Sequence, residues 1–528
     1  MKQLECDVVV VGGGATGVGI VRDAAMRGFR AVLVERADLG QGTTGRYHGL
    51  LHSGGRYVVS DPQSARECAA ENEIVRRINA DAVEATGGLF VSLRGDDPEF
   101  PERFVRGAAE TGVRVAEITA TEALRREPRL NPDIARVFEV EDASIDGWQL
   151  VWGVANSARD YGARILTYHR VTAIRSVPGE NGAERAVSAI ECRDERTGEE
   201  VHIDCRFVVN AAGAWAGQVA EMADCHGVEV VPGRGIMIAM NHRLVNRVVN
   251  RCVYPSDGDI IVPVHTVSII GTTDIRETDP DDLPIPRVEV QQMLDAGEQL
   301  VPGFRESRAL HAWAGARPLV KDTRVSASDT RHMSRGMQII DHLERDGLAG
   351  LLTITGGKLT TYRLMAEHVT DAMVAQMGES RVCRTADEAV PGSESGRLYQ
   401  VTHRLSEAEA GRGSDQILCE CELLSRRDFV STLHRMPDAS LDDLRRQLRL
   451  GMGPCQGGFC ALRAAGCAQT EGVVDAERAT SLLRNFLDNR WIGLWTILSG
   501  AQVRQTALDH WIWTGTLDVP HLPEEVTQ

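Results

Sequence analysis

The chain has 528 residues, of which 43% are hydrophobic and 25% are charged, and its formal net charge at pH 7 is −17. This length is too great for one hydrophobic core and predicts a globular protein of several domains. The acidic surface argues against a nucleic-acid partner, although a few converging Arg and Lys side chains can still bind a small anion.

The N-terminal residues MKQLECDVVVV have neither the long apolar region nor the cleavage site of a secretory signal. No stretch reaches the ~18 consecutive apolar residues of a membrane helix. We therefore expect a cytoplasmic protein that contacts a membrane only peripherally or through a partner. Because that compartment keeps thiols reduced, the twelve cysteines are not expected to form a disulfide framework.

The first segment of the chain has the pattern of a dinucleotide-binding βαβ unit. The apolar run DVVVV leads into GGGATG, a helical segment follows, and RAVLVE is a second short strand. Gly12 permits a tight turn, Gly14 lets the backbone approach a pyrophosphate, and Gly17 lets the helix pack closely on the strand. Glu35 lies at the end of the second strand, where an acid can bind a ribose hydroxyl.

Further elements follow along the chain. Residues 60–78 are predicted to form a helix, with Asp61 as its N-cap and Pro62 at its first position. The runs GIMIAM, DIIVPV and TVSIIGTT, between residues 230 and 273, predict an antiparallel sheet.

Two later strands end in glycine and could also approach a ligand. The apolar strand in FVVNAAGAW is followed by Gly213. The strand LLTIT leads through Gly356, Gly357 and Lys358 into a helix. The N-terminus of that helix could stabilise negative charge on a cofactor ring.

Four cysteines near the C-terminus form two close pairs. The pair Cys419-x-Cys421 is separated by 33 intervening residues from the pair Cys455-x4-Cys460. Such thiolates can hold either a [2Fe-2S] cluster or tetrahedral zinc. The short CxC spacing counts against zinc, and the surrounding glycines bring backbone N–H groups near the sulfurs, which suits an anionic cluster. Cys460 also begins an apparent helix, whose N-terminus favours a thiolate.

The chain contains, in this order, the segments VVVVGGGATG, GTTGRYHGLLHSGGRYV, IIGTTD, GARPL and GGKLTTYR. They resemble the FAD-dependent glycerol-3-phosphate dehydrogenases, within the wider group that shares the glycine oxidase and D-amino-acid oxidase fold. CEC followed by GMGPCQGGFC resembles the bacterioferritin-associated-ferredoxin-like [2Fe-2S] module in the catalytic large subunit of the anaerobic, respiratory enzymes. NRCVYPSDGDIIVP and LDNRWIG also resemble that subunit, so the resemblance covers essentially the whole chain.

The resemblance implies an α/β flavoprotein of the D-amino-acid-oxidase type. Its parts would be a Rossmann-like FAD-binding domain, an antiparallel-sheet substrate domain, a small iron-sulfur module and a helical tail. The expected ranges are 1–80, 150–215 and 340–380 for the discontinuous FAD-binding domain, 81–149 and 216–339 for the substrate domain, 381–416 for a linker, 417–470 for the [2Fe-2S] module and 471–528 for the helical cap.

The resemblance also places catalytic groups at the substrate face of the flavin. These are Arg317 of GARPL and Lys358 of GGKLTTYR. A guanidinium can hold a phosphate through two hydrogen bonds, and a lysine supplies a compact charge that stabilises a developing oxyanion. Arg56 and Tyr57 are expected to contact phosphate or hydroxyl groups, and Thr385 is a further candidate of this kind. Arg317 could instead form a structural ion pair with a carboxylate.

His52 is the candidate for the base that takes the hydroxyl proton, because the ordinary pKa of histidine lies near neutrality. His52 could instead hydrogen-bond a buried carbonyl. Relatives without the cluster have a histidine shortly after the pair that corresponds to Arg234-Gly235, where this chain has Ile236 and Met237. The identity of the base therefore stays open.

The expected contacts to FAD lie in the glycine-rich turn, after the second strand and in later loops. They are Gly12, Gly14, Gly17, Glu35, Arg36, Thr43, Thr44, His48, Gly49, Leu51, Val171, Gly213, Gly356, Gly357, Leu359 and Thr360. The two threonines at 43 and 44 could also merely cap a turn.

Four tryptophans lie near the C-terminus, at positions 491, 495, 511 and 513. They could form the small core of a helical cap, or a docking surface for partner subunits, because aromatic side chains are enriched in interfaces. The related enzymes work with a second flavoprotein subunit, together with a membrane-bound iron-sulfur subunit.

The resemblance implies that sn-glycerol 3-phosphate is oxidised to dihydroxyacetone phosphate on FAD. Electrons would leave through the [2Fe-2S] centre to the partner subunits and the quinone pool, at the inner face of the cell membrane. Two alternatives stay open. One is an FAD dehydrogenase of a 2-hydroxy acid or an amino acid, and the other is a redox-sensing flavoprotein without turnover.

Overall fold

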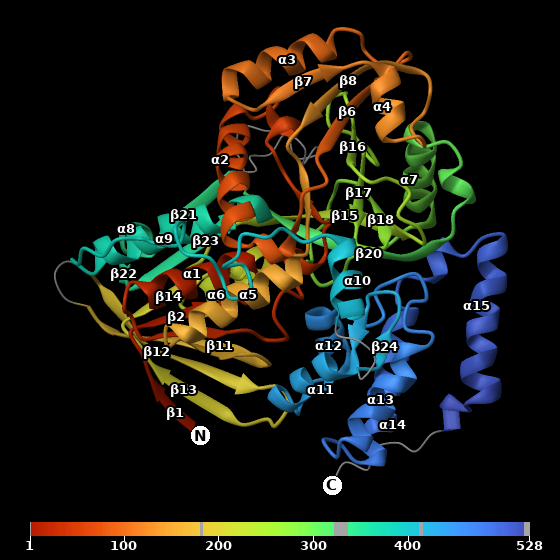
Figure 1. Cartoon of the computed structure of the whole chain (residues 1–528). Helices are drawn as coiled ribbons and strands as arrows, with labels where there is room; N and C mark the ends of the chain where they lie inside the picture. The colour runs from red at the N-terminus through yellow and green to blue at the C-terminus, as the bar shows by residue number, and fades with distance from the viewer. Residues whose placement is uncertain (1, 180–182, 321–335, 411–414, 522–528) are drawn as a thin grey trace.

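The computed structural model describes residues 2–179, 183–320, 336–410 and 415–521 (Figure 1). Of the expected domains, only the cysteine module at 417–470 lies wholly inside these ranges. None of the helices in the described part of the chain combines the length and the apolar composition that crossing a membrane requires.

The N-terminal βαβ unit forms as predicted. Strand β2 (Val8–Val11) leads into helix α1 (Ala15–Met26), and β3 (Ala31–Val34) lies parallel to β2. Every residue of both strands is buried, which explains their unbroken apolar runs. They belong to a six-stranded sheet in the order β10-β3-β2-β14-β23-β21, whose other strands are β10 (Arg164–Leu166), β14 (Phe207–Asn210), β23 (Leu351–Gly356) and β21 (Met337–Asp341).

Helices cover this sheet. α5 (Gly147–Asp160) and α9 (Tyr362–Gln376) both pack against α1. The predicted helix at 60–78 is α2 (Pro62–Ile78), and the carboxylate of its N-cap, Asp61, accepts the backbone N–H of Ser64 at 3.1 Å. The smaller helices α6 (Ala216–Glu221) and α8 (His342–Asp346) complete this region.

A nine-stranded sheet lies beside the first, at the top of Figure 1. Its order is β19-β15-β18-β17-β16-β6-β8-β7, with β20 paired to β15. Its strands are β6 (Gly88–Leu93), β7 (Val115–Ile118), β8 (Ile134–Val140), β15 (Val230–Met240), β16 (Val248–Arg251), β17 (Ile260–Val264), β18 (Val267–Gly271), β19 (Ile275–Arg276) and β20 (Ala309–Val320).

The three runs predicted to form an antiparallel sheet are β15, β17 and β18, and their pairing is antiparallel as predicted. The sheet also contains a parallel pair that was not predicted, β16 with β6. The two strands come from segments far apart in the chain, so their connection is long enough for parallel pairing. The helices α3 (Phe100–Thr111), α4 (Ala120–Arg126) and α7 (Arg287–Leu300) flank the sheet.

A smaller, five-stranded sheet lies beside the six-stranded sheet in the order β1-β13-β12-β11, with β22 paired to β12. Its strands are β1 (Lys2–Glu5), β11 (His169–Pro178), β12 (Arg185–Asp194), β13 (Glu200–Asp204) and β22 (Leu348–Ala349). A short three-stranded sheet contains β4 (Leu50–Leu51), β5 (Val83–Glu84) and β9 (Ala143–Ile145).

The C-terminal part is helical and has its own apolar core (Figure 1). Its elements are α10 (Val401–Ala410), β24 (Ile417–Cys419), β25 (Leu424–Ser425), α11 (Arg426–Arg435), α12 (Leu441–Leu448), α13 (Cys460–Thr470), α14 (Ala476–Trp491) and α15 (Ala501–Trp511). The predicted helix start at Cys460 is confirmed. The range expected to be a linker contains the helix α10, and the Tyr399 backbone N–H donates to the Val83 carbonyl at 2.9 Å.

Candidate functional site

A cavity of about 420 Å³ lies between the six-stranded and nine-stranded sheets, and we call it the central cavity. Most of the residues predicted to bind FAD or substrate line it. They are Gly12, Gly14, Glu35, Arg36, Thr43, Thr44, His48, His52, Arg56, Tyr57, Val171, Gly213, Arg317, Gly356, Gly357, Lys358 and Leu359.

Five of the predicted residues are placed elsewhere in the described structure. Gly17 is in α1, where an added Cβ would lie 1.9 Å from the Gly12 carbonyl oxygen. Gly49 packs against Val264, and Leu51 is buried in the core. The Thr360 hydroxyl accepts the backbone N–H of His52, a residue of the cavity wall. The fifth is Thr385.

Thr385 is buried between helices α1 and α9 and not at the central cavity. Its hydroxyl accepts a hydrogen bond from Arg363 at 3.3 Å, and its carbonyl accepts one from Arg22 at 3.4 Å. These contacts give Thr385 a place in the packing of the two helices.

One end of the central cavity has the features of a dinucleotide cradle. Gly12 has φ +110°, a conformation that favours glycine, and Gly14 is the N-cap of α1 without a side-chain cap. Gly14, Ala15 and Thr16 line the cavity where a pyrophosphate would lie, and the Ala15 N–H donates to the Thr44 hydroxyl at 3.1 Å. The carboxylate of Glu35 accepts the backbone N–H of Gly13 at 2.6 Å and that of Ala37 at 2.9 Å, which fixes its position at the rim.

The opposite end gathers cationic groups. The Arg317 guanidinium lies 3.2 Å from the Asp274 carboxylate and donates to the Thr273 carbonyl at 3.0 Å. The Arg56 guanidinium lies 2.9 Å from the buried carboxylate of Asp259. Burial alone would lower the pKa of Arg56, but the neighbouring Asp259 outweighs it and raises that pKa, so the side chain stays charged.

Lys358 and the aromatic residues complete this end. The Lys358 Nζ donates to the Ser64 hydroxyl at 2.7 Å and lies 4.6 Å from the centre of the Tyr57 ring. The His52 ring is 5.3 Å from the Tyr57 ring and 6.1 Å from the His48 ring. The candidate base therefore lies in the same group of side chains as the lysine.

The position of the missing histidine lies on β15. Gly235 and Met237 line the central cavity, so the chain has a thioether in place of an imidazole there. Arg234 points away: it is buried and pairs with Glu289 at 2.8 Å and with Glu277 at 2.6 Å. Its role is structural.

Several residues of the cavity were not predicted. Asp274, which pairs with Arg317, and Thr272 both lie in the segment IIGTTD, so the motif contained the signal although neither residue was selected from it. Arg46 also lines the cavity, and burial lowers its pKa. Arg46 lies within the segment GTTGRYHGLLHSGGRYV, so this motif also contained the signal although Arg46 was not selected from it.

The four predicted cysteines come together in a second site, which we call the four-cysteine site. Hydrogen bonds join the sulfurs in a chain from Cys419 to Cys460, to Cys455 and to Cys421. The bond to Cys460 lowers the pKa of Cys419 to about 7, and the bonds from Cys421 and Cys460 lower the pKa of Cys455. The same bonds raise the pKa of Cys421 and of Cys460, so two of the four thiols hold the protons that the other two give up more readily.

Backbone N–H groups surround these sulfurs. Those of Glu422 and Gly451 donate to Cys419, and those of Gly457 and Phe459 donate to Cys455. A Cβ added to Gly453 would lie 2.3 Å from the Cys421 Cβ, so glycine is needed for the loop to approach the cysteine. This donor set fits a sulfur-ligated metal centre, and the N–H groups suit a negatively charged one.

The four C-terminal tryptophans differ in their exposure. Trp513 is buried in the core of the C-terminal helices, and Trp491 packs partly against the core of the nine-stranded sheet. Trp495 is 72% exposed and Trp511 is 67% exposed. The tail therefore has a small core of its own and also presents aromatic side chains to solvent.

Comparison with known proteins agrees with this architecture. Residues 7–372 match the model of the FAD-dependent oxidoreductase family. The chain is 41% identical to the A subunit of anaerobic glycerol-3-phosphate dehydrogenase from Escherichia coli (strain K12), over 96% of each chain. It is 40% identical to the A1 subunit of the same enzyme from Haloferax volcanii, over 97% of this chain and 90% of that one.

Solved structures confirm the predicted fold class. Glycine oxidase from Geobacillus kaustophilus superposes with a TM-score of 0.56 at 22% identity, over 74% of this chain and 99% of that one. Glycerol-3-phosphate dehydrogenase from Bacillus halodurans, complexed with FAD, superposes with a TM-score of 0.58 at 21% identity, over 97% of this chain and 90% of that one. The chain belongs to the FAD-dependent oxidoreductase family and, within it, to the family of the anaerobic glycerol-3-phosphate dehydrogenase A subunits.

Proposed function

We propose that this chain is the catalytic subunit of an FAD-dependent glycerol-3-phosphate dehydrogenase, which oxidises sn-glycerol 3-phosphate to dihydroxyacetone phosphate. The observation that carries the proposal is that three cationic side chains, Arg56, Arg317 and Lys358, all line the central cavity. A phosphate monoester carries nearly two negative charges, whereas a carboxylate carries one. A cavity wall with several cations therefore suits the phosphate ester better. The 41% identity to the E. coli protein supports the same substrate.

The residues of the cavity can perform the parts of this reaction that fall to the protein. FAD, when bound, supplies the hydride acceptor. Arg317 and Arg56 bind the phosphate, and Lys358 stabilises negative charge on the substrate oxygen as its proton leaves. His52 accepts that proton. Asp274 holds the guanidinium of Arg317 in place.

We further propose that the four-cysteine site holds a [2Fe-2S] cluster, which carries electrons away from the flavin. The CxC spacing and the backbone N–H groups around the sulfurs support the cluster over zinc. The cysteine module packs against helix α5, and its Glu422 pairs with His265 of the nine-stranded sheet region, which supports a route for electrons from the central cavity to the module.

The electrons then pass to partner subunits and to the quinone pool. The names of the relatives designate one subunit of an enzyme, which supports a multi-subunit assembly. The exposed aromatic side chains of the C-terminal helices suit a partner surface, and Phe459, next to Cys460, is itself 63% exposed. The partners are a second flavoprotein subunit, together with a membrane-bound iron-sulfur subunit, which hold this chain peripherally at the inner face of the membrane.

An anaerobic spectrum of the purified chain, before and after sn-glycerol 3-phosphate is added, tests the function. We expect bleaching of the flavin and a paramagnetic signal from the reduced cluster. A 2-hydroxy acid and an amino acid, such as lactate and glycine, serve as comparison substrates and should leave the flavin oxidised. Reduction by lactate or glycine but not by the phosphate ester would refute the proposed substrate. Zinc without iron in elemental analysis would refute the cluster.

A further inference from the structure

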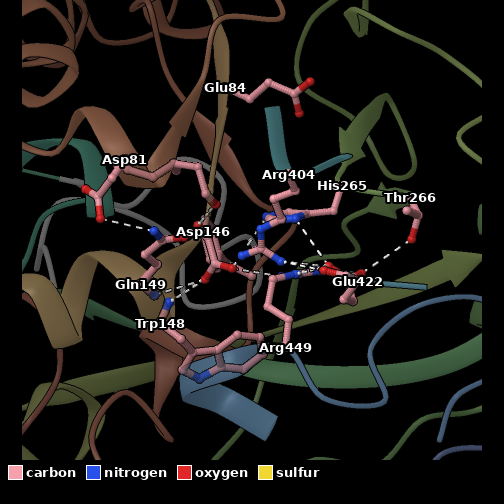
Figure 2. Close-up of polar contacts among 12 residues, drawn as sticks. Asp81, Glu84, Asp146, Trp148, Gln149, His265, Thr266, Arg404, Glu422 and Arg449 are labelled. Carbon is pink, nitrogen blue, oxygen red and sulfur yellow. Dashed lines mark hydrogen bonds and ion pairs between the residues drawn. The ribbon is translucent and has the colours of Figure 1, made fainter. Parts of the chain in front are cut away.

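Four charged or titratable side chains form a buried network where the cysteine module meets the rest of the protein (Figure 2). We call it the junction, and it consists of Asp146, His265, Glu422 and Arg449. No more than 7% of any of these side chains is exposed. Arg449 donates to Asp146 at 2.8 Å and to Glu422 at 2.9 Å. His265 lies 3.3 Å from Glu422 and 3.7 Å from Asp146.

The members of the junction come from three parts of the protein. Asp146 is the N-cap of α5, one of the helices that cover the six-stranded sheet, and its carboxylate also accepts the backbone N–H groups of Trp148 and Gln149. His265 lies in the turn between β17 and β18 of the nine-stranded sheet. Glu422 and Arg449 belong to the cysteine module. The junction therefore ties the module to helix α5 and to the nine-stranded sheet at one point.

The two junction residues of the cysteine module adjoin the four-cysteine site. Glu422 follows Cys421 in the chain, and its backbone N–H donates to Cys419. Arg449 lies two residues before Gly451, whose backbone N–H also donates to Cys419. A displacement of either side chain would move backbone groups that surround the sulfurs.

Two of the junction residues have a left-handed backbone conformation. Arg449 ends α12 with φ +60°, and His265 has φ +51°. Both conformations favour glycine, which commonly ends helices and fills tight turns at such positions. A residue that accepts this strain is expected to offset it through its side-chain contacts.

The same turn connects the wall of the central cavity to the cysteines. His48 lines the cavity, and a Cβ added to the next residue, Gly49, would lie 2.7 Å from the Val264 side chain. Thr266, two residues further, lies 3.3 Å from where a Cβ of Gly453 would be, and Gly453 packs directly on Cys421. The β17–β18 turn thus lies next to the cavity wall at Gly49 and next to the four-cysteine site at Gly453.

We propose, building on the function proposed above, that the junction positions the four-cysteine site for electron transfer from the flavin. The two electrons that FAD receives with the hydride leave one at a time, because a [2Fe-2S] cluster accepts a single electron, and each continues to a one-electron acceptor outside the chain. Asp146, His265, Glu422 and Arg449 are positioning residues in this step. They keep the module in one fixed orientation against the β17–β18 turn.

Such a network fixes the orientation of the cysteine module and does not strengthen its attachment. Burying ions costs desolvation energy that their attraction only partly returns, so apolar side chains would hold the module at least as tightly. A guanidinium, however, offers its donors in a rigid planar fork. Arg449 donates from two edges of that fork, to Asp146 at the start of α5 and to Glu422 in the cysteine module. The two hydrogen bonds therefore fix the angle between α5 and the module.

The test compares Arg449→Gly with the wild-type chain. Glycine suits the left-handed backbone at this position and removes only the guanidinium side chain. Arg463→Ala is the control, because Arg463 also pairs with a glutamate beside the cysteines, Glu420, but on the exposed surface. Asp146→Asn is the second variant: asparagine keeps the helix N-cap and removes the charge, so it decides the matter if Arg449→Gly does not fold.

Two readouts are needed on the full-length chain. In anaerobic stopped-flow mixing with sn-glycerol 3-phosphate, flavin bleaching should keep its wild-type rate in Arg449→Gly while reduction of the cluster slows at least about tenfold. This follows because removal of one partner of a buried ion pair shifts a docking equilibrium by about 100-fold or more. In hydrogen exchange, which requires neither substrate nor metal, the backbone amides of the β17–β18 turn should exchange faster in the variant, and Arg463→Ala should match the wild type.

Cluster reduction at the wild-type rate in both Arg449→Gly and Asp146→Asn would overturn the proposal. Failure of sn-glycerol 3-phosphate to bleach the wild-type flavin would instead refute the proposed function. Hydrogen exchange alone then decides on the junction: faster exchange of the turn in both variants supports its positioning role, and unchanged exchange refutes it.

Discussion

The Arg317 guanidinium and the Asp274 carboxylate lie 3.2 Å apart on the wall of the central cavity. Only 4% of the Asp274 side chain is exposed, against 22% of Arg317, so the acid is fixed in the protein while the guanidinium reaches into the cavity. The sequence left open whether Arg317 binds a ligand or forms a structural ion pair. The two roles are compatible, because the buried acid orients a guanidinium that still faces the cavity.

Arg317→Lys should lower kcat/KM for sn-glycerol 3-phosphate by about 100-fold, since a lysine cannot reproduce the two-point grip of a guanidinium on phosphate. Steady-state assays with a dye acceptor would measure it, with flavin content as a check on folding. Arg247→Lys is the control, because Arg247 pairs with Glu139 on the same sheet, away from the cavity. Equal activity of the two variants would exclude Arg317 from phosphate binding.

Gly17→Ala should abolish FAD binding. The added Cβ would lie 1.9 Å from the Gly12 carbonyl oxygen, so α1 would have to move away from the turn that cradles the pyrophosphate. We expect a loss of about 3 kcal/mol or more in the free energy of unfolding, as for severe overpacking. Gly466→Ala is the matched control: no atom lies within 4 Å of its added Cβ, and replacing an exposed helical glycine should stabilise the protein by about 0.5–1 kcal/mol. Flavin absorbance and denaturant unfolding measure both effects, and a yellow Gly17→Ala protein would contradict the first.

The parts of the fold that depend on neighbouring residues were predictable from the sequence. The βαβ unit, the N-cap at Asp61 and the helix start at Cys460 each follow from a local pattern of apolar, capping and glycine residues, and the structure confirms them. The parallel pairing of β16 with β6 was not predictable, because the pattern of a single strand does not specify its neighbour.

The parts of the site that join distant segments were harder to derive. Asp146 and Arg449 are 303 positions apart, and neither stands out by composition or spacing. Thr385 illustrates the opposite case, in which a residue selected by resemblance lies between two helices and not at the cavity. Local chemistry identifies which groups can bind a cofactor, but only the packing of the sheets decides which of them meet.

Cys421→Ser should remove the metal centre and leave the flavin intact. We expect iron content to fall while flavin bleaching by sn-glycerol 3-phosphate continues, because the two sites are separate and the cavity contains none of the four cysteines. Cys467→Ser is the control, since Cys467 lies in the same module, on α13, outside the four-cysteine site. Iron analysis and anaerobic spectra provide the measurement, and unchanged iron in Cys421→Ser would remove that residue from the ligand set.

His311 should make the protein less stable in mild acid. It lies on β20, and its burial, followed by the nearby charges of Arg445 and Arg490, lowers its pKa from 6.5 to about 3. Between these two values the unfolded chain binds a proton at this residue and the folded chain does not, so stability falls as the pH falls below 6.5. At pH 5 the loss from His311 alone amounts to about 2 kcal/mol relative to neutral pH.

His311→Gln should therefore lose about 2 kcal/mol less than the wild type between pH 7 and pH 5, whatever its stability at pH 7. Burial also lowers the pKa of His265 and of His342, and both contribute in the same direction, so only the difference between the two proteins isolates His311. Urea unfolding at the two pH values measures it, with the exposed His226→Gln as a control that should follow the wild type. Parallel losses in wild type and His311→Gln would mean that the folded protein already accommodates a charged imidazole between β20 and the C-terminal helices.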